Sequence, residues 1–190
     1  MEHRFYALRR GFATRYYWAE VLALTNTDPD VDYIGTGMRG FDGVAHLEIT
    51  KGAVPGDLLG NGSLLYIVSG KVLDVLKEYR FSGYDTYSVD VTGGRGDKLS
   101  YHGLVFLGKG GHILPSESGV KYGPKRPDGS RCIMKMERLV FDLDQWDGSD
   151  FFYVEEFPRG GIITGRVYDA FKKHKITNCE FIPLDEYCFG

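Results

Sequence analysis

The sequence lacks the features that mark membrane-spanning and disulfide-stabilised proteins. No run approaches the roughly 18 apolar residues that indicate a membrane span, and the first residues begin no apolar segment of signal-peptide length. The three cysteines are an odd number at wide spacing, with no C-x-x-C pair: Cys132, Cys179 and Cys188. A secreted disulfide framework usually has an even set of cysteines in a shorter chain. We therefore expect a cytoplasmic protein with reduced thiols and no membrane partner.

A local motif for catalysis, nucleotide binding or metal binding is also missing. Residues 35–40 spell G-x-G-x-x-G, but no helical period follows, whereas a dinucleotide site needs a helix to start there. This stretch predicts a Gly-rich loop, and the Arg-Gly-Asp at residues 95–97 predicts a hairpin turn. The five histidines show no zinc-binding spacing: His3, His46, His102, His112 and His174. We expect no catalytic residue, no cofactor and no metal. The alternative is an enzyme whose site is assembled only in three dimensions, with His102 or His112.

The charge balance argues against a nucleic-acid partner. The chain of 190 residues has a formal net charge of −3 and a pI of about 6.0, whereas nucleic-acid-binding domains usually have a basic face or a high pI. Hydrophobic residues make up 43% of the chain, which is ordinary for a globular protein, and the length fits one domain. No low-complexity linker divides the chain. We expect a single domain over residues 1–190.

An internal repeat is the clearest positive feature. Residues 67–85 align without a gap to residues 162–180, at a constant offset of 95. Five pairs of positions are identical: Ile67/Ile162, Gly70/Gly165, Val72/Val167, Asp74/Asp169 and Lys77/Lys172. Gly83 and Asn178 are both residue types that accept a positive φ at a helix end. Chance similarity between two amphipathic helices is the alternative, but the constant offset favours a duplication.

Each copy has the pattern of a strand followed by an amphipathic helix. A short apolar run ends at Ser69 or Thr164, residue types that cap the free N–H groups at a helix start. Apolar residues then recur at helical spacing. The pattern predicts helices near residues 70–80 and 165–175 whose buried stripe contains five residues: Val72, Val75, Leu76, Val167 and Phe171. An extended segment follows each helix.

Short β-rich runs dominate the rest of the chain. They cover residues 4–8, 45–49, 101–107 and 136–143. Together with the repeat, they predict an α+β fold with a mixed or antiparallel sheet and two repeat-related helices. The duplicated strand–helix–strand units would span about residues 57–92 and 151–187.

Residues 57–185 resemble the immunity protein 11 family of bacterial polymorphic-toxin systems. The resemblance rests on the helix phrases IVSGKVLDVL at 67–76 and IITGRVYDAF at 162–171, and on CEFIP at 179–183. Gly70 and Gly165 depart from the charged residue more often found there, and residues 1–50 have no counterpart. The resemblance implies an immunity protein, which neutralises a cognate toxin domain by stoichiometric binding and is not an enzyme.

One acidic segment stands out. Between residues 142 and 156 the chain has six acids and no Lys or Arg, with a tryptophan among them: Asp142, Asp144, Trp146, Asp147, Asp150, Glu155 and Glu156. A solvated loop is one interpretation, and a metal site would lack the EF-hand register. For an immunity protein we predict that the segment binds the partner, with carboxylates that suit a basic toxin and Trp146 as an anchor. The sequence predicts no particular oligomeric state, and a regulator that binds a small ligand or carbohydrate through its aromatic residues is a second alternative.

Overall fold

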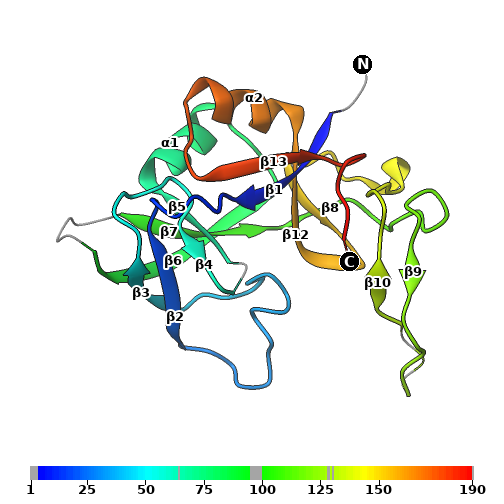
Figure 1. Ribbon diagram of the computed structural model, residues 1–190, viewed down its shortest axis with the longest axis horizontal. Helices are drawn as coiled ribbons and strands as arrows, with labels where there is room; N and C mark the ends of the chain where they lie inside the picture. The colour runs from blue at the N-terminus through cyan, green and yellow to red at the C-terminus, as the bar shows by residue number, and fades with distance from the viewer. Residues whose placement is uncertain (1–3, 64, 95–99, 128, 130, 190) are drawn as a thin grey trace.

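The computed structural model describes residues 4–63, 65–94, 100–127, 129 and 131–189. His3 and the turn predicted at residues 95–97 lie outside the described residues. Two mixed β-sheets lie beneath a pair of α-helices, and a small two-stranded ribbon lies at the side of the molecule (Figure 1). The expected α+β class with mixed sheets is therefore confirmed. No helix of the described residues is long and apolar enough to span a membrane.

The first sheet joins the two ends of the chain. Its strand order is β13-β1-β12-β11-β8, and β1 is antiparallel to both of its neighbours. The strands are β1 (Phe5–Arg10), β8 (Gly108–Lys109), β11 (Phe151–Val154), β12 (Phe157–Thr164) and β13 (Cys179–Pro183). The N-terminal strand thus lies between two strands from near the C-terminus.

The second sheet is built mainly from the first half of the chain. Its order is β4-β2-β3-β6-β7-β5, with β3 parallel to β6 and β2 parallel to β4. The strands are β2 (Trp18–Thr25), β3 (Val44–Lys51), β4 (Gly60–Asn61), β5 (Tyr66–Ser69), β6 (Tyr84–Gly93) and β7 (Tyr101–Phe106). A separate ribbon pairs β9 (Lys121–Tyr122) with β10 (Ile133–Lys135).

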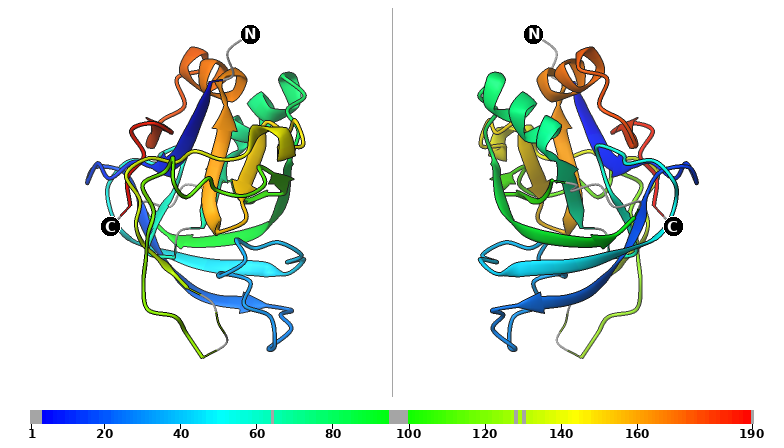
Figure 2. Two further views of the ribbon diagram at one scale, coloured as in Figure 1. Left: turned by 90° about the vertical axis from the view of Figure 1, so that its right-hand side faces the viewer. Right: turned by 90° about the vertical axis from the view of Figure 1, so that its left-hand side faces the viewer.

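Both helices lie where the repeat predicts them. They are α1 (Gly70–Glu78) and α2 (Gly165–Lys173), which lie side by side at one end of the molecule (Figure 2). Ser69 and Thr164 occupy the N-cap positions with extended backbone, but neither side chain bonds to a helix N–H. The predicted side-chain caps are therefore wrong. Each hydroxyl instead donates to a carboxylate, Asp57 or Asp150, at 2.8 Å, because a buried charge is the stronger acceptor.

Positions that are 95 residues apart also have similar backbone conformations. After α1, Arg80 and Gly83 have φ of 50° and 80°, and after α2, Lys175 and Asn178 have φ of 53° and 55°. The strand partners also correspond, because β5 and β6 both pair with β7, and β12 and β13 both pair with β1. A side chain at Gly83 would meet the carbonyl oxygen of Phe151 at 2.3 Å, so this turn requires glycine for space as well as for φ.

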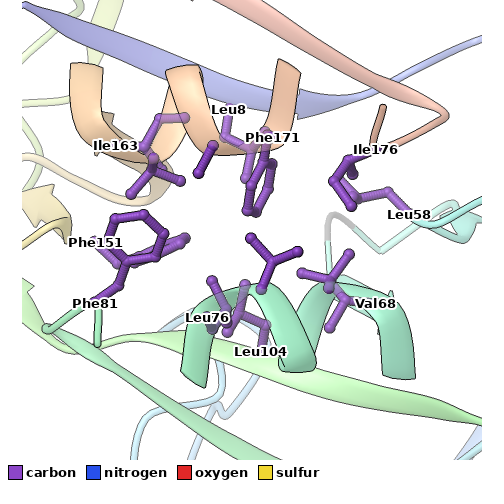
Figure 3. Packing of buried hydrophobic residues seen from close by; sticks show 14 of the residues in the cluster. Leu8, Leu58, Val68, Leu76, Phe81, Leu104, Phe151, Ile163, Phe171 and Ile176 are labelled. Carbon is purple, nitrogen blue, oxygen red and sulfur yellow. The ribbon is translucent and has the colours of Figure 1, made fainter. Parts of the chain in front are cut away.

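The main core fills the space between the two helices and the two sheets. Figure 3 shows Leu76 from α1 and Phe171 from α2 pointing into the same cluster. The five residues predicted to form the apolar stripes, Val72, Val75, Leu76, Val167 and Phe171, are all buried, so that prediction is confirmed. Two further clusters lie under the 31–42 loop and around the C-terminal segment.

One predicted strand is wrong. Residues 136–143 form no continuous strand, and only Met136 and Phe141 make isolated bridges, to Phe189 and Ile113 respectively. Between the bridges, Leu139 N–H donates to the carbonyl of Leu184. Residues of this run bond to different segments of the chain, so they cannot form a continuous β-ladder with one partner strand. Residues 35–40 form turns with no helix after them, in agreement with the predicted loop.

The packing of the two helices can be tested by truncation. Leu76 is 0% and Phe171 1% exposed, so Leu76→Ala and Phe171→Ala should each lower the free energy of unfolding by about 2–5 kcal/mol. Urea unfolding measures this change. The control is Leu22→Ala, because Leu22 is 60% exposed and its loss should change stability by less than about 0.5 kcal/mol. Equal effects at the three positions would contradict the assigned core.

Candidate functional site

The acidic segment 142–156 consists of a loop that leads into β11, of β11 itself and of the first residues of the turn to β12. It begins with a short 3-10 helix, η1 (Leu143–Gln145), and ends at the turn between β11 and β12. Asp142 accepts hydrogen bonds from the backbone N–H of Asp144 at 3.2 Å and from the Gln145 side chain at 2.6 Å. The carboxylate at its start therefore fixes the first turn of the loop.

Asp147 fixes the second half of the loop. Its carboxylate accepts from the backbone N–H of Lys109 at 2.8 Å and from that of Ser149 at 3.0 Å. Partial burial alone would raise the pKa of Asp147, but the hydrogen bonds from Ser149 and Lys109 and the nearby Lys109 charge outweigh burial and lower that pKa. The loop is thus tied to β8, and a lysine distant in sequence lies beside it.

Trp146 is an internal anchor of the same loop. Its ring packs edge-on against Phe5 at 5.1 Å and tilted against Phe152 at 5.8 Å between ring centroids. Its indole N–H donates to the carbonyl of Ser149 at 3.2 Å. The side chain is half-buried, so it contributes to the core and presents part of its surface.

The last two acids lie at the β11–β12 turn. Glu156 accepts from the backbone N–H of Ile113 at 3.0 Å, and its other oxygen lies 3.0 Å from His112 Nδ1. Glu155 is exposed, as is Asp144 on η1. The surface that the segment presents is therefore carried mainly by Asp144, Asp147 and Glu155.

Asp150 does not belong to that surface, because it is only 3% exposed. It accepts from the Thr164 hydroxyl at 2.8 Å, from the backbone N–H of Ser82 at 3.2 Å and from Arg166 at 3.1 Å. The ion pair with Arg166 neutralises its charge. Two of the six acids thus have a cation nearby in space, Asp150 with Arg166 and Asp147 with Lys109.

Asp57 has a nearly identical environment and was not found by sequence reasoning. It accepts from the Ser69 hydroxyl at 2.8 Å, from the backbone N–H of Thr177 at 2.8 Å and from Lys71 at 3.4 Å. The partners of the two aspartates correspond at the offset of 95: Ser69 with Thr164, Lys71 with Arg166, and Ser82 with Thr177. The Ser/Thr-x-Lys/Arg phrase at each helix start was the available signal, because a hydroxyl and a cation two residues apart suit one carboxylate.

Each aspartate therefore connects the two units. It bonds to the start of the helix that follows it and to the turn after the other helix. Between these two bridges, Tyr79 and His174 meet at the ends of the helices, with the hydroxyl 3.3 Å from Nε2. These two residues are also 95 positions apart, so this contact joins equivalent positions of the two aligned segments.

The described histidines have partners on the surface. His46 Nδ1 lies 3.2 Å from Asp90 and its Nε2 lies 3.5 Å from the Thr25 hydroxyl. His102 Nε2 lies 3.1 Å from Ser100 Oγ. The His46 side chain is 36% exposed and that of Asp90 59% exposed, so this pair is not in a deep cleft. Within the described residues no group of three or more His, Cys, Asp or Glu is arranged to hold a metal ion.

Comparison with known proteins adds no assignment. No protein-family model matches the chain, and no curated protein matches it.

The bridge at Asp57 predicts how stability depends on pH. Burial alone would raise the pKa of Asp57, but the hydrogen bonds from Thr177 and Ser69 and the Lys71 charge outweigh burial, so its pKa lies below the ordinary value of 3.8. A lowered pKa in the folded state stabilises the protein above the unfolded-state pKa, and this stabilisation is lost as pH falls through the folded pKa. Asp57→Asn should cost about 1.5–3 kcal/mol at neutral pH.

The measurement is the free energy of unfolding of wild type and Asp57→Asn at several pH values. The difference between the two should shrink as pH falls below about 5. Asp74→Asn, an exposed acid on α1, is the matched control and should change stability little at any pH. A difference that stays constant down to acidic pH would contradict the assigned role of the Asp57 charge.

Proposed function

We propose that this chain is a bacterial immunity protein that acts in the cytoplasm by binding a cognate toxin domain in a stoichiometric complex, without turnover. The observation that supports it best is the ordered acidic loop. Asp144, Asp147 and Glu155 are exposed on a backbone held by hydrogen bonds to Asp142 and Asp147. A loop ordered before binding loses less conformational entropy in the complex.

The charge of the loop suits a basic partner. Toxins that cut nucleic acid need a cationic surface to hold phosphate. The carboxylates of an inhibitor can occupy that surface in place of the phosphates. Leu143 on η1 is 44% exposed and lies beside Asp144, so the loop also offers an apolar contact. Central apolar contacts with a charged rim are the usual anatomy of a specific interface.

We also propose that the two strand–helix–strand units arose by duplication. The support is the common offset of 95 in the helix bounds, the positive-φ turns and the partners of Asp57 and Asp150. The central strand of each unit comes from a different place in the chain. β7 follows the first unit, whereas β1 precedes the second by more than a hundred residues.

Neutralisation is tested by co-expression in bacteria with the C-terminal domain encoded by the neighbouring toxin-type reading frame. We expect that domain to arrest growth, this chain to restore growth, and the two to elute as one stoichiometric complex. A neighbouring domain that the chain neither binds nor neutralises would reject the proposal. A neighbourhood of metabolic genes would favour the enzyme alternative.

The binding face is tested with charge variants that keep the internal hydrogen bonds of the loop. The double variant Asp144→Asn/Glu155→Gln should slow association with the toxin domain several-fold at low salt, and the difference should shrink at high salt because rim charges mainly steer encounter. The matched control is Glu48→Gln/Asp74→Asn, two exposed acids on β3 and α1. Stopped-flow measurement of the association rate decides: if both double variants associate alike, the interface lies elsewhere.

A further inference from the structure

The structure contains a cavity of about 620 Å³. Its walls come from β1 and β12, from the 58–67 segment that contains β4 and β5, and from residues of the β9–β10 ribbon and the C-terminal segment. Figure 1 shows these elements around the C-terminus. Small-molecule sites in proteins are usually clefts of roughly 300–1,000 Å³ with mainly apolar walls and a few polar groups. The size of this cavity falls within that range.

Apolar side chains form most of the walls. They include Leu59, Leu65 and Ile67, which are buried, and also Phe157 and Phe189. These residues belong to segments that are far apart in the sequence. A ligand with an apolar body would therefore be covered from several sides.

The charged residues around the cavity are unbalanced. Three of the residues that line it are arginines, Arg9, Arg10 and Arg131, and the one acid among them is Glu156. Glu156 is already engaged by the Ile113 N–H and His112. Among the described residues, neither Arg9 nor Arg10 forms an ion pair with a carboxylate.

Arg10 is held by aromatic rings instead of an acid. Its guanidinium carbon lies 4.8 Å from the ring centroid of Trp18 and 5.3 Å from that of Phe12. Its Nε is buried and has no hydrogen-bond partner, and burial, only partly offset by Tyr66, lowers the pKa of Arg10. Arginine nevertheless stays protonated at physiological pH. A permanent charge that no carboxylate of the described residues pairs with therefore stands at the cavity wall.

Arg9 and the two tyrosines complete this end of the cavity. The Arg9 guanidinium lies 4.8 Å from the Tyr187 ring centroid. The Tyr66 hydroxyl donates to the Leu8 carbonyl at 2.8 Å and accepts from the Gly161 N–H at 3.0 Å. Burial raises the pKa of Tyr66 to about 12, so this phenol is neutral and cannot serve as the missing anion.

We propose that this cavity binds a small monocarboxylate with an apolar body, whose carboxylate is held by Arg9 and Arg10. A planar guanidinium matches a carboxylate with two parallel hydrogen bonds, and the anion would supply the negative charge that neither arginine has as an ion-pair partner among the described residues. The apolar walls would cover the rest of the ligand. The proposal does not rest on the proposed toxin binding, because none of Asp144, Asp147 and Glu155, the acids proposed to face the toxin, lines the cavity.

The probes are decanoate and decanol, which share an apolar chain and differ in charge. Isothermal titration calorimetry of the full chain should show saturable one-to-one binding of decanoate, at least 10-fold tighter than that of decanol. Arg10→Gln should weaken decanoate binding about 10-fold or more and leave decanol binding unchanged. Arg15→Gln is the matched control, because Arg15 also stacks on an aromatic ring, that of Tyr16, but does not line the cavity.

Each other outcome rejects the proposal. Equal affinity for the acid and the alcohol would show a purely apolar pocket, and a signal that never saturates would show surface adsorption only. Near-UV circular dichroism checks that each variant is folded. If Arg10→Gln does not fold, Arg9→Gln replaces it, and full decanoate affinity in the folded variant would show that the arginines do not hold the anion.

Discussion

Asp57 and Asp150 impose the main constraint on this fold, because each places a carboxylate where little water reaches it. A buried charge is tolerated only when hydrogen bonds and an opposite charge replace its hydration. Here the replacements come from both units at once: a hydroxyl and a cation at the start of one helix, and an N–H from the turn after the other. Neither aspartate is satisfied by its own unit alone, so the helices, their turns and the core between them form together.

This coupling explains how the distant ends of the chain are joined. The turn after α2 must reach Asp57, which is 120 residues away from Thr177, and β13 follows that turn directly. β13 needs a partner on its inner edge, and β1 supplies it, as β7 does for β6. The N-terminal segment, which had no counterpart in the family resemblance, is thus a central strand of the first sheet.

Local patterns predicted what depends on local physics. The helix bounds and the buried stripes followed from apolar spacing and from the phrase repeated at an offset of 95, and the structure confirms them. The side-chain caps at Ser69 and Thr164 were wrong because a carboxylate distant in sequence competes for each hydroxyl. The strand at 136–143 was wrong because strand formation depends on a partner edge, and no single edge runs beside those residues. Both errors come from contacts with residues that are distant in the sequence, which a local pattern cannot predict.

Acidic residues that look alike in the sequence have two different roles in the structure. Asp150 and Asp144 stand in one acidic segment, yet Asp150 is paired with Arg166 and buried, whereas Asp144 is exposed. Pairing in space, not the count of charges, decides which groups are free to meet a partner. The net charge of −3 is therefore a poor guide to binding. Asp144 and Asp147 are exposed on one loop, whereas Arg9 and Arg10, which form no ion pair with a carboxylate of the described residues, line a cavity that the sequence does not reveal. Each of the two proposed sites, one for a basic surface and one for an organic anion, depends on its own local imbalance of charge and not on the net charge of the chain.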